Sequence, residues 1–166
     1  METKTEITES LNDVFSGLEK AIKRFDAESF NHKSTKDTWS PAQVAQHLVL
    51  AGADFDKVLS GNTKFTDGPA DARVIPLKEI LLNFELKMKA PAFIEPVDKN
   101  YNQRELLQQL DHIGKVVAKL ISDLDLTETC LDFELPGFGH ITRLEAIYFL
   151  IYHTQRHTYQ LNKMSS

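Results

Sequence analysis

Residues 141–163 read ITRLEAIYFLIYHTQRHTYQLNK, a stretch that begins with a helix start signal and continues at helical spacing. Thr142 and Glu145 form the pattern T-x-x-E of a capping box, in which each side chain accepts a hydrogen bond from the other residue's backbone amide. The pattern predicts a helix from about Arg143 to Lys163. His153 and His157 lie four residues apart, so they share one face of this helix, one turn from each other.

A second helix start lies in WSPAQ, residues 39–43. Ser40 is placed to cap the helix, Pro41 occupies its first position, and Gln43 completes a capping box. The helix is predicted to run from Pro41 until Ser60–Asn62 ends it. Its apolar seam consists of Val44, Leu48, Ala51, Phe55 and Val58.

Three further segments show apolar residues at steps of three and four. One predicts a helix from about Thr5 to Phe25, and another predicts a helix within residues 102–124. A shorter amphipathic helix is predicted from Leu77 to about Lys89, stopped by Pro91 and Pro96. Residues 26–39 break the helical pattern and are predicted to form a loop.

Four long helices and one short helix predict an all-α bundle that forms a single domain over residues 1–166. Residues 62–76 are a long connection with two prolines. Together with the short helix, this connection lets the second and third long helices run in the same direction, which a tight turn would forbid. Residues 131–135, LDFEL, alternate as an extended segment does, but they are too few to form a sheet of their own.

The composition excludes several classes of protein. Of the 166 residues, 42% are hydrophobic and 26% are charged, as in globular proteins. The net charge of −5 argues against nucleic-acid binding. The single cysteine, Cys130, allows no internal disulfide. The polar N-terminus has no signal-peptide pattern, and no apolar run is long enough to span a membrane, so we expect a cytoplasmic protein.

The chain has six histidines, and their positions differ in character. His32 lies in a polar loop, His112 lies on a helix, and His140 follows a glycine turn, so each is interpreted as structural or solvated. His47 falls about 60° from the seam of the second helix, given 100° per residue, and can therefore point into a groove between helices.

His153 and His157 also lie at the side of their helix's seam. Together with His47, they are three imidazoles from two helices that could converge on one point. Neutral imidazole binds zinc, nickel and copper well, and three protein ligands leave one position open for water or substrate. The alternative is that the pair is two polar residues on a packed helix. The pair lacks the glutamate of H-E-x-x-H metalloproteases, because Thr154 follows His153.

Two longer motifs, DTWSPAQVAQHL (residues 37–48) and PGFGHITRLEAIYFLIYHTQRH (residues 136–157), resemble the DinB-like family, also called the YfiT/DinB superfamily. The resemblance covers nearly the whole chain. It implies a four-helix bundle with up-down-down-up topology and one extra short helix in the long connection. It also implies a metal site at His47, His153 and His157, with zinc or nickel as the usual metal, and a homodimer.

The resemblance leaves several functions open. It is compatible with an enzyme that transfers a low-molecular-weight thiol of the bacillithiol type to a small electrophile, and with a thiol-dependent isomerase. It is also compatible with a metal-dependent hydrolase that uses metal-bound hydroxide. No carboxylate is adjacent to the histidine pair in sequence, which favours the thiol route because a hydrolase would gain from a general base. A non-enzymatic metal-binding stress protein and an interaction bundle without metal are the remaining alternatives.

Other residues are weaker candidates, and no catalytic residue beyond the ligands is identified. Arg156 and Gln160 flank the histidine pair and could orient a ligand. The turn at residues 137–139 and His140 are considered as a pocket rim. Trp39 is expected to pack against Val44 or its neighbour ahead of the helix cap.

Overall fold

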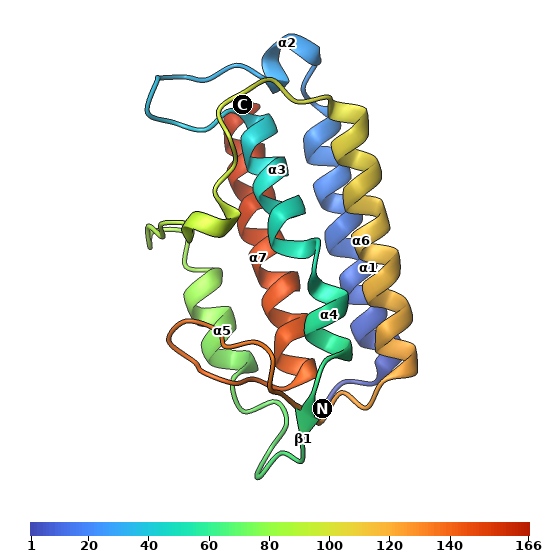
Figure 1. Cartoon of the computed structure of the whole chain (residues 1–166). Helices are drawn as coiled ribbons and strands as arrows, with labels where there is room; N and C mark the ends of the chain where they lie inside the picture. Colours follow the sequence, from blue (N-terminus) through green and yellow to red (C-terminus); the bar gives the residue numbers. More distant parts are fainter.

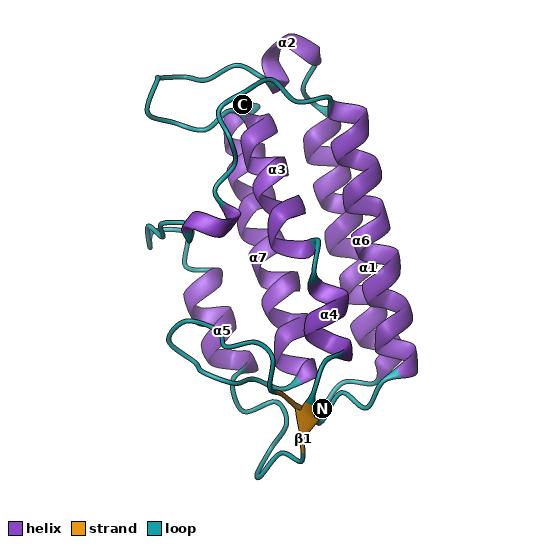
Figure 2. Cartoon of the chain, viewed as in Figure 1, coloured by secondary structure: helices purple, strands orange, loops and turns teal.

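Four helical stretches that run along the molecule form the body of the protein (Figures 1 and 2). The structure is a computed structural model that describes residues 1–166. The long stretches are α1 (Lys4–Lys23), α3 (Pro41–Gly52) followed by α4 (Phe55–Ser60), α6 (Gln103–Asp123) and α7 (Arg143–Met164). None of these helices is both long enough and apolar enough to cross a membrane.

The directions of the helices confirm the predicted up-down-down-up bundle (Figure 1). At one end, Lys4 at the start of α1 donates to the carbonyls of Ser122 and Leu124 at the end of α6, so these two helices are antiparallel. At the other end, Arg24 after α1 donates to Asn162 near the end of α7, so α1 and α7 run in parallel.

Short elements complete the fold. They are α2 (Ala27–Phe30), β1 (Thr63–Lys64), α5 (Val74–Leu81), the 3-10 helix η1 (Ala92–Ile94) and β2 (Thr129–Cys130). The two strands pair antiparallel, with Thr63 opposite Cys130. The extended pairing therefore lies just before residues 131–135, where an extended segment was predicted. The turn α2 was missed within the predicted loop, although Asp26 and Ser29 cap it reciprocally.

The second long helix is not continuous, which corrects the prediction of one helix from Pro41 to Ser60. It breaks at Ala53 and Asp54, where the backbone of Asp54 leaves helical geometry (φ −106, ψ 17). Gly52 has low helix propensity and lies tightly against α6, since a Cβ there would be 2.9 Å from Ile113 Cγ2. The helix thus breaks directly after a residue that packs tightly against α6.

The short helix α5 ends at Leu81 and not near Lys89. After Leu81 the side chain of Asn83 accepts a hydrogen bond from the backbone N–H of Glu85 at 3.2 Å, which forms a turn in place of another helical turn. Phe84 and Met88, which extended the helical pattern in the sequence, are exposed. Their spacing was therefore not a sign of helix packing.

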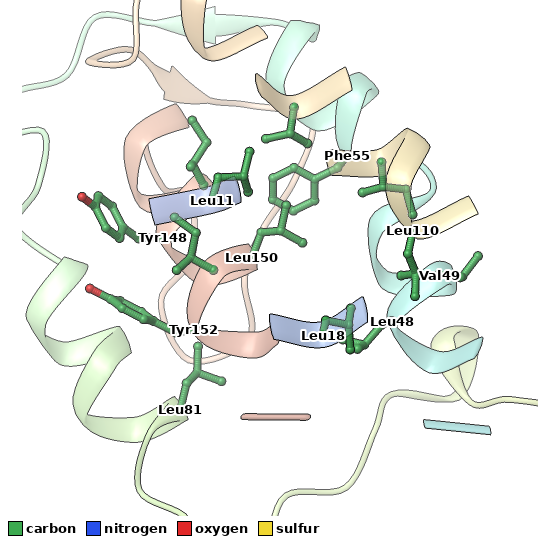
Figure 3. Packing of buried hydrophobic residues seen from close by; sticks show 14 of the residues in the cluster. Leu11, Leu18, Leu48, Val49, Phe55, Leu81, Leu110, Tyr148, Leu150 and Tyr152 are labelled. Atoms are coloured by element: carbon green, nitrogen blue, oxygen red, sulfur yellow. The ribbon is translucent and has the colours of Figure 1, made fainter. Parts of the chain in front are cut away.

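One cluster of buried apolar side chains lies between the long helices, and every one of them contributes to it (Figure 3). Leu11 and Leu18 come from α1, Phe55 from α4, Leu110 from α6, and Leu150 from α7. Burial of such side chains stabilises each by about 1.5–3 kcal/mol relative to exposure. This core fixes the helices against one another and so sets where the side chains at its edge meet.

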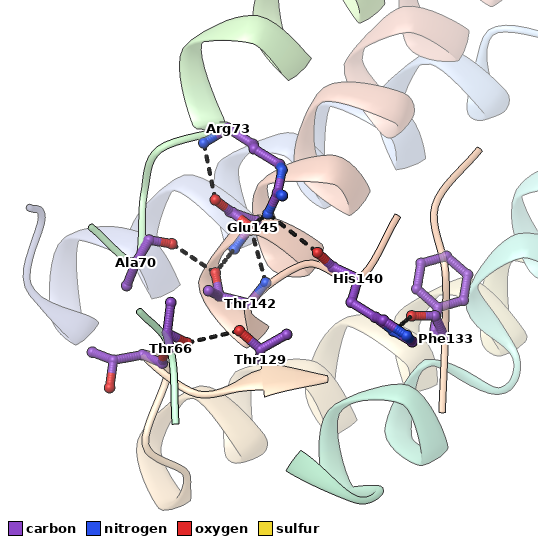
Figure 4. A network of polar contacts seen from close by, with 9 residues as sticks. Thr66, Ala70, Arg73, Thr129, Phe133, His140, Thr142 and Glu145 are labelled. Carbon is purple, nitrogen blue, oxygen red and sulfur yellow. Dashed lines mark hydrogen bonds and ion pairs between the residues drawn. The ribbon is translucent and has the colours of Figure 1, made fainter. Parts of the chain in front are cut away.

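The start of α7 is anchored by a buried polar network (Figure 4). Thr142 Oγ1 accepts from the Glu145 N–H at 3.0 Å, and Glu145 Oε2 accepts from the Thr142 N–H at 2.9 Å, which confirms the predicted capping box. The Arg73 N–H also donates to Glu145 Oε1 at 2.9 Å, and Thr142 Oγ1 donates to the carbonyl of Ala70 at 2.7 Å. The box therefore fixes both the helix and the connection before α5.

We predict that Thr142→Ala lowers the free energy of unfolding by about 1–2 kcal/mol, because it removes a helix cap and a buried hydrogen bond together. Urea unfolding followed by circular dichroism measures the change. Thr3→Ala removes the exposed capping box of α1 and serves as the control, with a smaller expected loss. Equal losses in the two variants would contradict the role given to the buried network.

Candidate metal centre

Helix α3 places His47 at the edge of the core. Its predicted capping box is present: Ser40 Oγ accepts from the Gln43 N–H at 3.1 Å, and Gln43 Oε1 accepts from the Ser40 N–H at 2.9 Å. His47 follows two turns later and is only 2% exposed. A rigid helix start thus holds the imidazole in a buried position.

Helix α7 brings two further imidazoles to the same point, as the sequence spacing predicts. His153 Nε2 lies 3.1 Å from His47 Nε2 and 3.2 Å from His157 Nε2. The ligand atoms of the three residues all lie within 4.8 Å of one another. His153 is 8% exposed, whereas His157 is partly exposed, so the cluster is accessible from the His157 side.

The partners of the outer ring nitrogens determine which nitrogens face the centre. His47 Nδ1 lies 2.9 Å from the carbonyl oxygen of Ile94, and His157 Nδ1 lies 2.8 Å from Gln160 Oε1. Carbonyl oxygens only accept hydrogen bonds, so both Nδ1 atoms carry the proton. The Nε2 atoms of His47 and His157 therefore present lone pairs to the centre of the cluster, as metal-binding imidazoles do.

This arrangement fits a metal ion better than it fits a hydrogen-bonded cluster. A single N–H on His153 Nε2 can be donated to only one of its two neighbours, so at least one of the two close Nε2–Nε2 contacts is not a hydrogen bond. His153 Nδ1 is buried without any partner. Ligands at about 2.05 Å from a tetrahedral zinc ion are about 3.3 Å apart, close to the two observed distances. The donor set thus fits a divalent transition metal, with its identity left open.

Electrostatics keep the three rings neutral, which metal binding requires. Burial lowers the pKa of His47 below its ordinary value, although the Ile94 carbonyl opposes the shift. Burial also holds the pKa of His153 well below its ordinary value, aided by charge repulsion from His157, His47 and Arg156. Burial lowers the pKa of His157 to about 4. All three imidazoles are therefore free bases at neutral pH.

Aromatic rings lie against the cluster. The Trp39 ring is 5.2 Å from the His47 ring, centre to centre, so Trp39 contacts the site in addition to the core packing expected of it. Phe149 stacks on His153 at 5.3 Å with an angle of 12° between the planes. Phe149 was missed in the sequence, although its position one turn before His153 was a usable signal. The Ile94 carbonyl was also missed, since a backbone acceptor has no side-chain signature.

The remaining candidates lie outside the ligand cluster. Gln160 orients His157, but Arg156 donates to backbone carbonyls at the end of α5 and just after it. The turn at residues 137–139 and His140 lie near the start of α7, and His153 is ten residues further along, roughly 15 Å away. The interpretation of this turn as a pocket rim stays a prediction. His140 instead contacts the Phe133 carbonyl, and His32 and His112 are not in the cluster either.

We predict that the metal-free protein loses stability as the pH falls from about 6.5 to about 4. Histidine in the unfolded chain takes up a proton near pH 6.5, while the folded imidazoles stay neutral to a lower pH, so the unfolded state binds more protons in this window. The expected loss is a few kcal/mol, measured by urea unfolding in the presence of a chelator.

His157→Gln removes one of these groups and should make the pH dependence shallower across the same window. Carboxylates with lowered pKa values, such as Asp26 and Asp132, lose their contribution at lower pH and do not obscure the comparison. An identical slope in the two proteins would contradict the assignment of neutral, buried imidazoles.

The comparison with known families agrees with the geometry. The family model of the DinB superfamily matches residues 11–161, a range that contains all three clustered histidines. No curated protein and no solved structure matches the chain significantly. Because the match extends over most of the chain, the protein belongs to the DinB superfamily.

Proposed function

We propose that the protein is a metal-dependent enzyme that transfers a low-molecular-weight thiol to a small electrophile. His47, His153 and His157 would hold the metal, zinc or nickel. The observation that carries the proposal is a ligand cluster made only of neutral imidazoles, with no carboxylate among its members. The expectations of a homodimer and of a cytoplasmic location stay predictions, and light scattering on the purified protein would test the first.

The lack of negative charge in the ligand cluster supports an anionic ligand for the bound metal. No carboxylate contributes to the lowered pKa values of the three histidines. A divalent cation held by them would therefore keep its full positive charge, and Arg156 adds a further positive charge nearby. A thiolate is a soft anion that such a cation attracts, whereas a hydrolase would gain from a general base, and the cluster itself contains no carboxylate.

The surroundings support a small apolar electrophile as the second substrate. Phe93 is exposed and precedes Ile94, whose carbonyl contacts His47. Tyr159, two residues after His157, stacks on Phe84 with ring centres 3.9 Å apart. Phe93 therefore gives exposed apolar surface one residue from a backbone contact of the centre, whereas the Phe84–Tyr159 pair lies on another face of α7 from His157. Trp39 and Phe149 shield the other imidazoles from water.

The chain's own residues have defined tasks in this reaction. A bound divalent cation supplies Lewis acidity, which lowers the pKa of a thiol and favours the nucleophilic thiolate. Ile94 and Gln160 fix the imidazoles by accepting from their Nδ1–H groups. The thiol proton leaves to solvent, the sulfur forms a bond to the electrophilic carbon, and the leaving group departs with its bonding electrons. Buried Cys130, whose pKa is raised to about 11 by burial, takes no part.

Metal binding is the first prediction. Protein prepared without a polyhistidine tag and loaded with zinc or nickel should hold about one ion per chain, measured by elemental analysis. His153→Ala should lower this to less than about a tenth while the circular dichroism spectrum stays helical. His112→Ala, an exposed histidine on α6, is the matched control and should bind as the wild type does. Equal binding by all three proteins would exclude the proposed ligands.

Turnover is the second prediction. The metal-loaded protein should consume electrophiles such as haloaromatics or epoxides in the presence of bacillithiol or another small thiol, with product formation followed by mass spectrometry. Esters and amides tested in parallel should not react, and the His153→Ala protein should be inactive. Hydrolysis of an ester or amide without any thiol would overturn the transferase proposal in favour of a hydrolase.

A further inference from the structure

Arg156 lies between the two clustered histidines of α7, but its guanidinium binds the backbone of another segment. Nη1 donates to the carbonyl oxygens of Leu81 at 3.1 Å and Asn83 at 3.0 Å, and Nη2 donates to the carbonyl of Leu86. Leu81 is the last residue of α5, so the guanidinium caps the end of that helix. Burial lowers the pKa of Arg156, and no carboxylate partner contributes to the shift.

The segment held by Arg156 leads to the metal centre. We call residues 82–96 the strap, because they pass from the end of α5 to the 3-10 helix η1 and its following proline. Beyond the turns at its start and η1, the strap has little regular structure, and its side chains Met88 and Phe93 are exposed. Its position therefore depends on a few attachments. Arg156 and the Phe84–Tyr159 stack hold one end, and buried Pro96 holds the other.

The strap supplies the acceptor that fixes His47. The Ile94 carbonyl lies 2.9 Å from His47 Nδ1, and this contact places the His47 lone pair at Nε2, toward His153. A displaced carbonyl would leave the ring free to rotate or to carry its proton on Nε2, the nitrogen that must bind the metal. The orientation of a ligand on α3 thus depends on a segment that a side chain of α7 holds in place.

We propose that Arg156 is a positioning residue of the metal centre: by binding the start of the strap, it keeps the Ile94 carbonyl against His47 and fixes that ring's tautomer. The part of the inference that concerns metal affinity rests on the proposed function. The tautomer and the order of the strap are properties of the metal-free protein, so they test the inference independently.

The first test compares Arg156→Met with wild type in the metal-free state. Ring ¹⁵N chemical shifts at about pH 8, where the imidazoles are neutral, report the His47 tautomer. We expect the Nδ1–H form in the wild type and a mixture of forms in the variant. Amide hydrogen exchange in residues 82–96 should become about tenfold faster or more. Arg104→Met, at an exposed arginine on α6, is the control and should change neither measurement.

Metal affinity gives a second test, in which the sign of the effect separates two roles. If Arg156 acted only through its charge, Arg156→Met would tighten cation binding and Arg156→Lys would leave it unchanged. If Arg156 acts through the strap, both variants should lower the affinity for zinc, which chelator competition measures. The expected loss in Arg156→Met is about tenfold. The effect in Arg156→Lys should be smaller, because an ammonium group reproduces only part of the fork of donors.

Arg156→Lys also guards against a simple folding defect, since it retains the charge and the stem and its circular dichroism can be compared with wild type. An unchanged His47 tautomer together with unchanged strap exchange in Arg156→Met would overturn the inference, as would tighter zinc binding. If the wild type binds no metal, the proposed function fails, while the tautomer and exchange measurements still decide on the role of Arg156.

Discussion

Three neutral imidazoles meet near the edge of the core with no carboxylate in the cluster, and the rest of the structure serves to hold them there. His153 Nε2 lies 3.1 Å from His47 Nε2 and 3.2 Å from His157 Nε2. The Nε2 atoms of His47 and His157 carry lone pairs, because their Nδ1–H groups donate to carbonyl oxygens. In the absence of a cation this arrangement is unfavourable, because at least one of the two close nitrogen contacts is not a hydrogen bond and leaves a buried lone pair without a donor. The bundle must therefore provide the free energy that keeps α3 and α7 together, and a bound cation would return part of it.

Contacts far from the histidines determine where the bundle places them. The register of α7 is fixed at its start, where Glu145 is 1% exposed and binds both Thr142 and the backbone of Arg73. His153 lies roughly 12 Å further along a helix with a rise of 1.5 Å per residue. Since a packed helix neither stretches nor rotates easily, the anchor and the core contacts between them determine where His153 and His157 point. On α3 the capping box of Ser40 has the same task for His47.

The features that sequence reasoning predicted correctly are those encoded by local patterns. Both capping boxes, the long amphipathic helices and the convergence of His47 with the pair on α7 follow from spacing, caps and the family motifs. The break at Asp54 and the early end of α5 did not follow, because packing of Gly52 against Ile113 and the turn at Asn83 override the periodic pattern. The Ile94 carbonyl could not be predicted, since a backbone acceptor that reaches the site through a loop is independent of the residue type at that position.

The strap joins exposed apolar side chains to a backbone contact of the candidate metal centre. Exposed apolar residues such as Phe84 and Phe93 belong to the same segment whose carbonyl orients His47. A substrate that packs on those exposed rings would therefore press on the segment that determines the direction of a ligand's lone pair. In a rigid site, binding and ligand orientation are independent. In the proposed reaction the strap would couple them through Arg156 and Ile94, so that apolar contact with the proposed electrophile and the geometry of the three imidazoles would depend on the same few hydrogen bonds.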